Sequence, residues 1–258
     1  MSHWSDELCE YYNITPEEAL ELGTRSKGRR PNFPSSISCP NPPQGKTFEE
    51  IWDEKPRDTF QQKMDFYAQI GPWQTFRQTI YRLDFDYSVY FQHFDFTKDS
   101  LCILEYGCGI THLTNHIVNK LDGNIPPNVK FILVDVPGEH MEYAKWRLKK
   151  KAPNVDFEFH EITEKYPLPE FKSKIDFTLM TDVLEHLPNP FDVIKNITEH
   201  SNPKAKIIET WHHEGDDYGY ADLEEAVLQR DETLKYMEEH YKIVGTMGAG
   251  DIRVREIK

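Results

Sequence analysis

A short segment with two glycines contains the residues best suited to holding a ligand against the main chain. It follows the apolar run 101–104 and reads Glu105-Tyr106-Gly107-Cys108-Gly109-Ile110-Thr111. Glycine lets the backbone turn tightly and approach a ligand with no Cβ in the way. A dinucleotide site needs the spacing G-x-G-x-x-G/A, whose last small residue permits close packing of helix on strand. His112 occupies that position here, so the spacing argues against NAD or FAD.

Three carboxylates follow other apolar runs at the corresponding place. Asp135 ends the run 131–134, Glu161 follows the run 155–159, and Asp182 follows the run 175–180. A carboxylate accepts hydrogen bonds from paired hydroxyls or from an amino group. If the runs are parallel strands, their carboxyl ends meet at one edge of a sheet, where ligands bind in doubly wound folds.

His186 is a candidate general base. It lies four residues after Asp182, so the two side chains share a helical face if this segment forms an α-helix. A base is needed only when the group to be modified arrives protonated, as a hydroxyl or an ammonium does. The alternative is a histidine held by structural hydrogen bonds at the start of a helix.

A second group of candidates, His212 and His213, lies in the segment 209–218, which also carries several carboxylates. These residues could supply a base, contact a substrate, bind a metal or form a solvated loop. The spacing matches no zinc signature, and the four cysteines form no C-x-x-C pair. The sequence therefore predicts no metal site and a reduced, cytoplasmic setting.

Apolar runs alternate with helical patterns from about residue 98 onward, which predicts right-handed crossovers and a parallel sheet. Strands are expected near 101–104, 131–134, 155–159, 175–180 and 206–210. One helix should begin at Asn189-Pro190, and another at a capping box formed by Asp222 and Glu225. The segments 241–247 and 252–257 flank the turn 248–251, which predicts a terminal β-hairpin.

The N-terminal part favours helices joined by loops. Thr15-Pro16-Glu17-Glu18 is typical of a helix start, and Gly23 is expected to close that helix. Proline and serine dominate 24–46, which predicts an irregular loop, and helical spacing returns over 60–70 and about 73–83. We therefore expect residues 1–97 to form a helical cap with a loop lid over a domain spanning 98–258.

The formal net charge of −14 argues against broad binding to nucleic acid, which needs a basic surface. Two basic clusters remain. The cluster 145–151 falls at the end of an expected helix, where cations complement the helix dipole. The cluster 25–30 could contact an anionic substrate or be solvated. The apolar runs are too short to cross a membrane.

Over residues 98–258 the sequence resembles the class I methyltransferases that use S-adenosylmethionine (SAM). The stretch Glu105-Tyr106-Gly107-Cys108-Gly109 is similar to their first motif, an acidic residue followed by G-x-G-x-G, with Thr111 in place of the third glycine. The stretch 175–190 is similar to the fourth-strand motif of small-molecule and quinone methyltransferases. The terminal hairpin also suits the antiparallel seventh strand of that family.

This resemblance implies a Rossmann-like, seven-stranded, mostly parallel sheet and SAM as the cofactor. It implies that Asp135 binds the ribose hydroxyls, that Glu161 meets the adenine amino group, and that the upstream Arg77 binds the methionine carboxylate. In the phosphoethanolamine-type enzymes a histidine spaced like His186 works with a tyrosine near the active site. The full set of candidate cofactor-binding residues is Glu105, Gly107, Cys108, Gly109, Asp135, Val136, Glu161, Ile162, Asp182 and Arg77.

The leading interpretation is an enzyme that transfers a methyl group from SAM to oxygen or nitrogen of a small-molecule acceptor. One alternative is an RNA or protein methyltransferase that uses the loop 25–30 as its anchor. Another is a SAM-binding protein that runs a different reaction or none. The sequence does not identify the acceptor or the oligomeric state.

Overall fold

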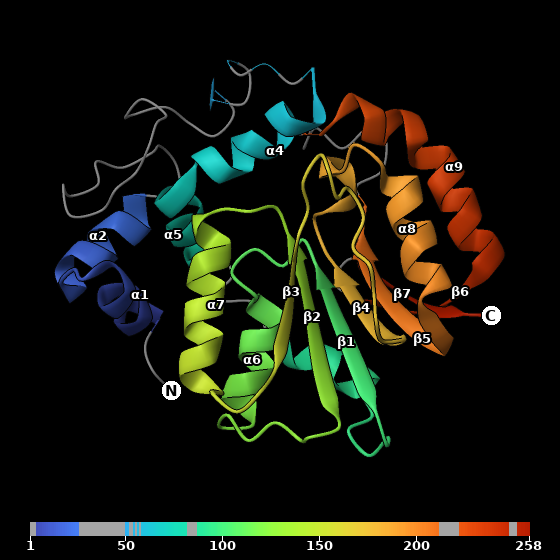
Figure 1. Ribbon diagram of the computed structural model, residues 1–258, viewed down its shortest axis with the longest axis horizontal. Helices are drawn as coiled ribbons and strands as arrows, with labels where there is room; N and C mark the ends of the chain where they lie inside the picture. The colour runs from blue at the N-terminus through green and yellow to red at the C-terminus, as the bar shows by residue number, and fades with distance from the viewer. Residues whose placement is uncertain are drawn as a thin grey trace. The chain divides into compact units, whose positions relative to one another are not determined.

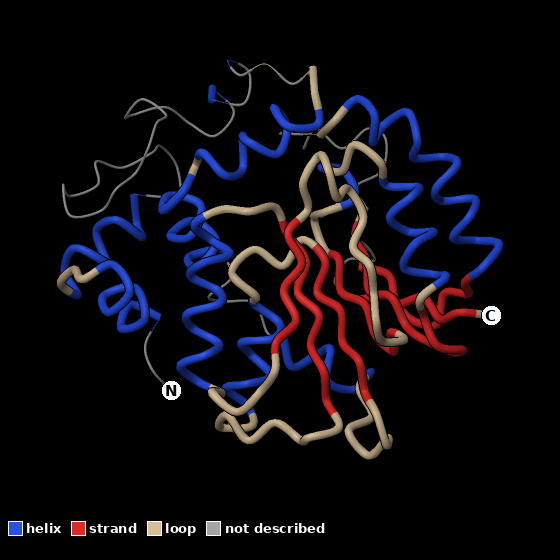
Figure 2. Tube along the Cα trace, viewed as in Figure 1, coloured by secondary structure: helices blue, strands red, loops and turns tan. Residues whose placement is uncertain are grey.

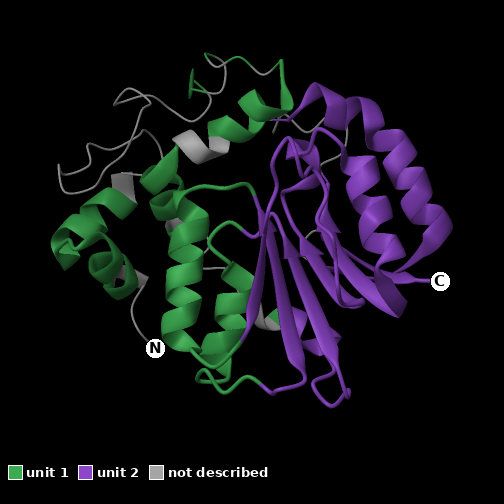
Figure 3. Ribbon diagram, viewed as in Figure 1, with its two compact units in different colours: residues 1–89, 109–125, 136–155 green, residues 90–108, 126–135, 156–258 purple. Residues whose placement is uncertain are grey.

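The computed structural model describes residues 4–25, 50–51, 54, 56, 58–81, 87–211, 222–247 and 252–258. The chain divides into two compact units, shown in Figure 3. Unit 1 contains residues 1–89, 109–125 and 136–155, and unit 2 contains 90–108, 126–135 and 156–258. The segments after the first two strands thus group with the N-terminal helices. The domain boundary expected at residue 97 stays a prediction.

All strands of the sheet lie in unit 2 (Figures 1 and 2). The seven strands run in the order β3-β2-β1-β4-β5-β7-β6. The first five strands pair in parallel, and β7 is antiparallel to both β5 and β6. This confirms the mostly parallel sheet with a terminal antiparallel hairpin. The strands are β1 (Leu101–Tyr106), β2 (Val129–Asp135), β3 (Phe157–Glu161), β4 (Ile175–Met180), β5 (Ser201–Thr210), β6 (Tyr241–Met247) and β7 (Ile252–Ile257).

The central strands explain why the sequence pattern identified them well. Every residue of β1 and of β4 is buried. Residues 101–104 of β1 form the continuous apolar run that is typical of a strand buried on both faces. β4 differs, because it also buries Asp176 and Thr178 between its apolar residues. β5 is longer than expected, because its first residues, from Ser201 to Lys204, are partly exposed and polar or conformationally restricted. Periodicity alone could not include them.

The pairing register aligns the carboxyl ends of the parallel strands, so that they end at the same edge of the sheet. Asp135 of β2 lies opposite Glu161 of β3, and Tyr106 of β1 lies opposite Val134. On the other side, Met180 of β4 lies opposite Glu209 of β5. The residues that follow these strands therefore emerge along one edge of the sheet.

Two helices of unit 2 pack against each other, α8 (Pro190–Glu199) and α9 (Glu224–His240). Phe191 and Tyr236 meet edge to face with ring centroids 5.5 Å apart. The predicted start of α8 at Asn189-Pro190 is confirmed, with Pro190 in the first helical turn. The short 3-10 helices are η1 (Tyr87–His93) and η2 (Leu184–His186).

The expected capping box of Asp222 and Glu225 is wrong. The N-cap of α9 is Leu223, and no side chain caps the helix. Instead the backbone N–H of Leu223 donates to the carbonyl of Glu185, at 2.9 Å. A contact with a distant segment of the chain thus sets where this helix begins, and a local motif cannot report such a contact.

Unit 1 is helical in its described residues. Thr15 and Glu18 form the predicted capping box, with N–H to side-chain distances of 2.8 and 3.2 Å. The expectation that Gly23 ends this helix is wrong, because the helix continues for another two residues. The helices are α1 (Trp4–Tyr12), α2 (Pro16–Arg25), α4 (Phe60–Gln69), α5 (Gly71–Tyr81), α6 (His112–Lys120) and α7 (Glu139–Lys151).

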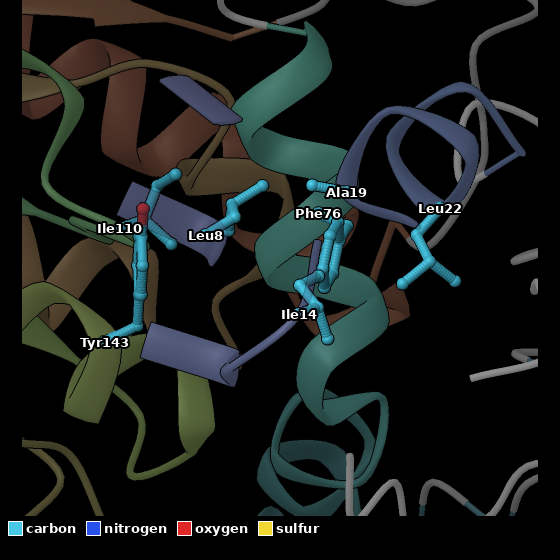
Figure 4. Close-up of a cluster of buried hydrophobic side chains, with 7 residues drawn as sticks. All are labelled: Leu8, Ile14, Ala19, Leu22, Phe76, Ile110 and Tyr143. Carbon is cyan, nitrogen blue, oxygen red and sulfur yellow. The ribbon is translucent and has the colours of Figure 1, made fainter. Parts of the chain in front are cut away.

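An apolar cluster joins several helices of unit 1 (Figure 4). Phe76 of α5 stacks on Tyr12 of α1, with ring centroids 5.1 Å apart. Large aromatic side chains contribute most of the buried area at such a junction. The cluster consists of Leu8, Ile14, Ala19, Leu22, Phe76, Ile110 and Tyr143.

A buried ionic network fastens α1 to α7 beside this cluster. Glu7 accepts from Arg147 at 2.8 Å and also pairs with Lys151. The side chains of Glu7 and Arg147 are only 9% and 8% exposed. The last turn of α7 contains Lys149, Lys150 and Lys151. Cations at this end complement the helix dipole, as the sequence predicted. The partner on α1 is a contact that spacing could not show.

No helix among the described residues is long and apolar enough to span a membrane.

Replacing Glu7 by Gln should lower the free energy of unfolding by about 3 kcal/mol, because it leaves two buried cations without their counter-charge. Glu10→Gln is the matched control, since Glu10 pairs with Lys150 across side chains that are 54% and 48% exposed. Exposed pairs contribute about 0–1 kcal/mol. Urea unfolding of both variants measures the difference. Equal effects would contradict the structural role given to Glu7.

Candidate active site

Gly107 forms the turn at the end of β1, and only glycine fits there. Its φ is +63°, in the left-handed region, and a Cβ would lie 2.5 Å from Cγ2 of Val183. The residue is nevertheless exposed to solvent. The main chain at Gly107 therefore presents an open surface to a ligand while its other side is closed by Val183.

The next residue ties this turn to the neighbouring strand. The N–H of Cys108 donates to the carbonyl of Val134, at 3.0 Å, and the Cys108 side chain is buried. The turn therefore lies beside the end of β2, where Asp135 stands. Glu105, the acidic residue of the motif, is buried within β1. Burial raises the pKa of Tyr106, and the charge of Asp135 raises it further, so the phenol stays protonated at neutral pH.

The second part of the motif lies in unit 1 and has the same left-handed backbone. Gly109 has a φ of +52°, and a Cβ there would lie 2.5 Å from Oε1 of Gln78. Thr111 has a φ of +58°, although it is β-branched and fully buried. Its hydroxyl donates to the carbonyl of Ile110, at 2.7 Å. Thr111, at the position of the family's third glycine, thus holds a left-handed backbone at a strain cost of about 1–3 kcal/mol.

The carboxylates of β2 and β3 form a second part of the site. Asp135 and Glu161 are register partners on adjacent parallel strands, so their side chains leave the same face of the sheet. Asp135 is half-buried and Glu161 is exposed. The N–H of Ile162 donates to the carbonyl of Asp135, at 2.8 Å, which continues the pairing beyond the strand ends.

A two-point hydrogen-bond clamp follows β4. Asp182 has a left-handed φ of +57°, and its N–H donates to Oγ1 of Thr210, at 2.7 Å. The Thr210 hydroxyl in turn donates to Oδ1 of Asp182, at 3.1 Å. Thr210 is buried at the end of β5, whereas Asp182 is exposed. The clamp fixes the main chain of the β4 loop and holds its carboxylate in place.

The expected α-helical pairing of Asp182 with His186 is wrong. The segment forms only the 3-10 turn η2, which begins two residues after Asp182. The N–H of His186 donates to the carbonyl of Val183, at 2.9 Å, and the side chain is half-buried. The left-handed conformation of Asp182 keeps the chain out of the α-helical region at this point, and that conformation is not visible in residue spacing.

Sequence reasoning missed a buried ion pair beneath this edge. Glu209 of β5 accepts from Nε of Arg255 on β7, at 2.8 Å, and the two side chains are 0% and 3% exposed. Glu209 lies inside β5, within the strand expected at 206–210. Charges inside apolar strands usually indicate a buried partner, and this signal could have found Arg255.

Seven of the ten candidate cofactor-binding residues lie in unit 2, at or next to the carboxyl ends of its strands: Glu105, Gly107, Cys108, Asp135, Glu161, Ile162 and Asp182. Gly109, Val136 and Arg77 belong to unit 1. His212 and His213 lie outside the described residues, as do the basic cluster 26–30, most of the loop 24–46 and the turn 248–251. Within the described part of the chain, no three or more His, Cys, Asp or Glu side chains gather as a metal site.

Comparison with known protein families gives a match over the strands that carry this geometry. A family model described as "Methyltransferase domain" matches residues 104–207, from β1 to β5. Residues 104–207 are thus similar to a methyltransferase domain. The match includes the glycine turn, Asp135, Glu161 and Asp182. The family assignment made from the sequence motifs is confirmed, as are the fold class and the enzyme class.

Several solved structures are similar to this chain. A SAM-dependent methyltransferase from Aquifex aeolicus is 21% identical, with a TM-score of 0.47 over 68% of this chain and 90% of that chain. An O-methyltransferase from Bacillus cereus, solved in complex with SAH, is 13% identical, with a TM-score of 0.47 over 67% and 78%. The [4+2]-cyclase SpnF is 16% identical, with a TM-score of 0.46 over 66% and 60%, so the chain spans less than two thirds of that protein.

At these identities and TM-scores the solved structures do not bear on the acceptor. A search of the curated proteins gave no match.

Replacing Gly107 by Ala should lower the free energy of unfolding by about 2 kcal/mol or more, because of the left-handed φ and the contact with Val183. Gly245→Ala is the control, since a Cβ there would meet only Val254 at 3.7 Å. Chemical denaturation compares the two. A Gly107 variant as stable as the Gly245 variant would contradict the geometry of the turn.

Thr210→Val should lower the free energy of unfolding by about 1–2 kcal/mol, because it removes the two hydrogen bonds between the Thr210 hydroxyl and Asp182. Thr210→Ser keeps the hydroxyl and should recover most of the loss. Thermal unfolding of the two variants distinguishes a lost hydrogen bond from a lost methyl group. If Ser and Val have the same effect, the clamp does not contribute.

Proposed function

We propose that this methyltransferase transfers the methyl group of SAM to a small-molecule acceptor at the carboxyl edge of the sheet. The observation that carries the proposal is the exposed, left-handed turn at Gly107, fixed next to the end of β2 by the Cys108 N–H. Ligands of doubly wound sheets bind outside the carboxyl ends of the strands. The acceptor's oxygen or nitrogen would be the atom methylated.

The residues of unit 2 suit the chemistry of SAM. A Cβ at position 107 would collide with Val183, so the position requires glycine, and the residue is exposed to solvent. Asp135 would accept from the two ribose hydroxyls, and Glu161, its register partner, would meet the adenine amino group. Glu105 and Asp182 supply carboxylates for the positively charged methionine end. Cys108 and Ile162 fix the loops through their main chain.

SAM supplies an electrophilic methyl group bound to a sulfonium. The protein's part in such a transfer is chiefly alignment of the nucleophile with the methyl group. The Asp182–Thr210 clamp holds the loop after β4 in a fixed position. The hydrogen bond from Cys108 to Val134 does the same for the turn after β1. Preorganised loops of this kind make alignment possible without a costly rearrangement.

His186 remains the candidate general base within the described residues. Its ring is half-buried at the end of η2, four residues beyond the clamped Asp182. A base is required only for an acceptor that arrives protonated. His212 and His213, and the roles of Arg77, Gly109 and Val136 in cofactor binding, stay predictions.

Asp135→Asn should weaken the binding of S-adenosylhomocysteine by about tenfold or more, because a charged hydrogen bond contributes about 1.5–3 kcal/mol. Asp156→Asn is the matched control, since Asp156 is exposed and precedes β3 at the opposite edge. Isothermal titration calorimetry measures both affinities.

Unchanged affinity in the Asp135 variant would exclude the ribose role. Binding of NADH by the wild-type protein, with no heat from SAM or S-adenosylhomocysteine, would overturn the proposed function itself. Tight binding of SAM without methyl transfer to any small molecule would favour the non-methylating alternative.

A further inference from the structure

The second half of the first motif, Gly109-Ile110-Thr111, is held by helices of unit 1 that lie far from it in the sequence. Gly109 and Thr111 have left-handed φ angles of +52° and +58°, and Ile110 between them is fully buried. A β-branched residue such as Thr111 adopts this conformation only where surrounding contacts compensate the strain. The contacts made by Ile110 therefore decide whether the segment keeps its shape.

Gln78 of α5 holds the N–H of Ile110. Its Oε1 accepts from that N–H, at 3.1 Å. The same amide group covers Gly109, because a Cβ there would lie 2.5 Å from Oε1 and 2.8 Å from Nε2 of Gln78. The Gln78 side chain thus occupies the space left by the absent side chain of Gly109 and fixes the next residue to α5.

Arg147 of α7 holds the carbonyl of Ile110. Its Nη1 donates to that oxygen at 3.0 Å, and the arginine is only 7% exposed. The Thr111 hydroxyl donates to the same oxygen. A hydrogen bond from a charged donor is roughly twice as strong as one between neutral groups. Both polar backbone groups of Ile110 are therefore bonded to side chains, one from α5 and one from α7.

The other end of the Arg147 guanidinium is held by α1. Nη2 pairs with Oε2 of Glu7 at 2.8 Å, and Cζ lies 5.3 Å from the centroid of the Tyr143 ring. Nε has no hydrogen-bond acceptor in the described part of the chain, so the two terminal nitrogens make these contacts. One rigid fork thus joins the N-terminal helix to the glycine motif. A lysine, with a single ammonium group, cannot reproduce that geometry.

A second cation of α7 supports the same segment through α6. Lys151 also pairs with Glu7, and it donates to Oδ1 of Asn115, at 2.7 Å. The N–H of Asn115 in turn donates to the carbonyl of Thr111, at 2.8 Å. Glu7 therefore anchors two cations, one that bonds Ile110 directly and one that acts through Asn115.

We propose that Gln78 and Arg147 are positioning residues for the cofactor. They fix Ile110, and through it the turn that begins at the exposed Gly107, three residues earlier in the chain. This inference rests on the proposed function, because it assumes that SAM contacts this turn. Both residues act on the buried Ile110 backbone, so they are not themselves expected to touch the nucleoside.

Preorganisation of the turn explains how these contacts affect binding. A loop that has to be ordered when its ligand arrives loses part of the binding free energy to that ordering. Hydrogen bonds that already hold the loop in the free protein remove this loss. Replacing Gln78 or Arg147 should therefore weaken the binding of the cofactor, whereas replacing a residue that only stabilises the fold would lower the Tm alone.

The test uses the full chain and measures S-adenosylhomocysteine binding by calorimetry, well below the lowest Tm of the set. Gln78→Met keeps the length of the side chain but removes the acceptor. Arg147→Met removes the guanidinium, and Arg147→Lys keeps a positive charge for Glu7 without the fork. Gln61→Met and Lys150→Met are the matched controls, because both residues are exposed in helices of unit 1.

We expect the Kd for S-adenosylhomocysteine to rise about fivefold in Gln78→Met and about tenfold or more in Arg147→Met, with both controls unchanged. Arg147→Lys should regain much of the lost Tm but keep a raised Kd. The double variant Gln78→Met with Arg147→Met should lose less affinity than the product of the single losses, because both residues hold Ile110. Should Arg147→Met not fold, Gln78→Met and Arg147→Lys decide the test.

Variants that melt at a lower temperature but bind the nucleoside as tightly as the wild type would overturn the inference, because Gln78 and Arg147 would then only stabilise the fold. Full recovery of affinity in Arg147→Lys would also overturn it, as would a double loss equal to or larger than the product. A wild-type protein that binds no S-adenosylhomocysteine would instead overturn the proposed function, and this inference with it.

Discussion

The parallel register of β3, β2, β1, β4 and β5 is the constraint on which the candidate site depends. It places Asp135 level with Glu161, and Met180 level with Glu209, so that the loops after the strands emerge along one edge. A one-residue slip in any pairing would move the following side chains to the other face of the sheet. The burial of every residue of β1 and β4 makes such a slip costly. The position of the chemistry is therefore set by packing in the core.

Left-handed backbone at the strand ends completes the edge. Gly107 adopts it with no Cβ to meet Val183, and Asp182 adopts it with two hydrogen bonds to Thr210 as compensation. Thr111, at the position of the family's third glycine, also has a left-handed φ, and its hydroxyl donates to the preceding carbonyl.

The sequence predicted the sheet and the family because both depend on periodic apolar runs and on residues adjacent in the chain. The places of Asp135, Glu161 and Gly107 at strand ends were predicted for the same reason, while their roles in binding SAM stay predictions. The features it could not predict are contacts between distant segments: Glu7 with Arg147, Glu209 with Arg255, and the Leu223 N–H that starts α9. The helical pairing of Asp182 with His186 failed because one left-handed residue breaks the regular spacing on which it relied.

SAM is proposed to bind at the edge of the sheet formed by Gly107 and Asp135. A crystal structure of the protein with S-adenosylhomocysteine tests it most directly. We expect the ribose hydroxyls to donate to the Asp135 carboxylate. The nucleoside should contact the main chain of Gly107, which has no side chain. A nucleoside bound elsewhere, with Asp135 making no contact to the ribose, would contradict it.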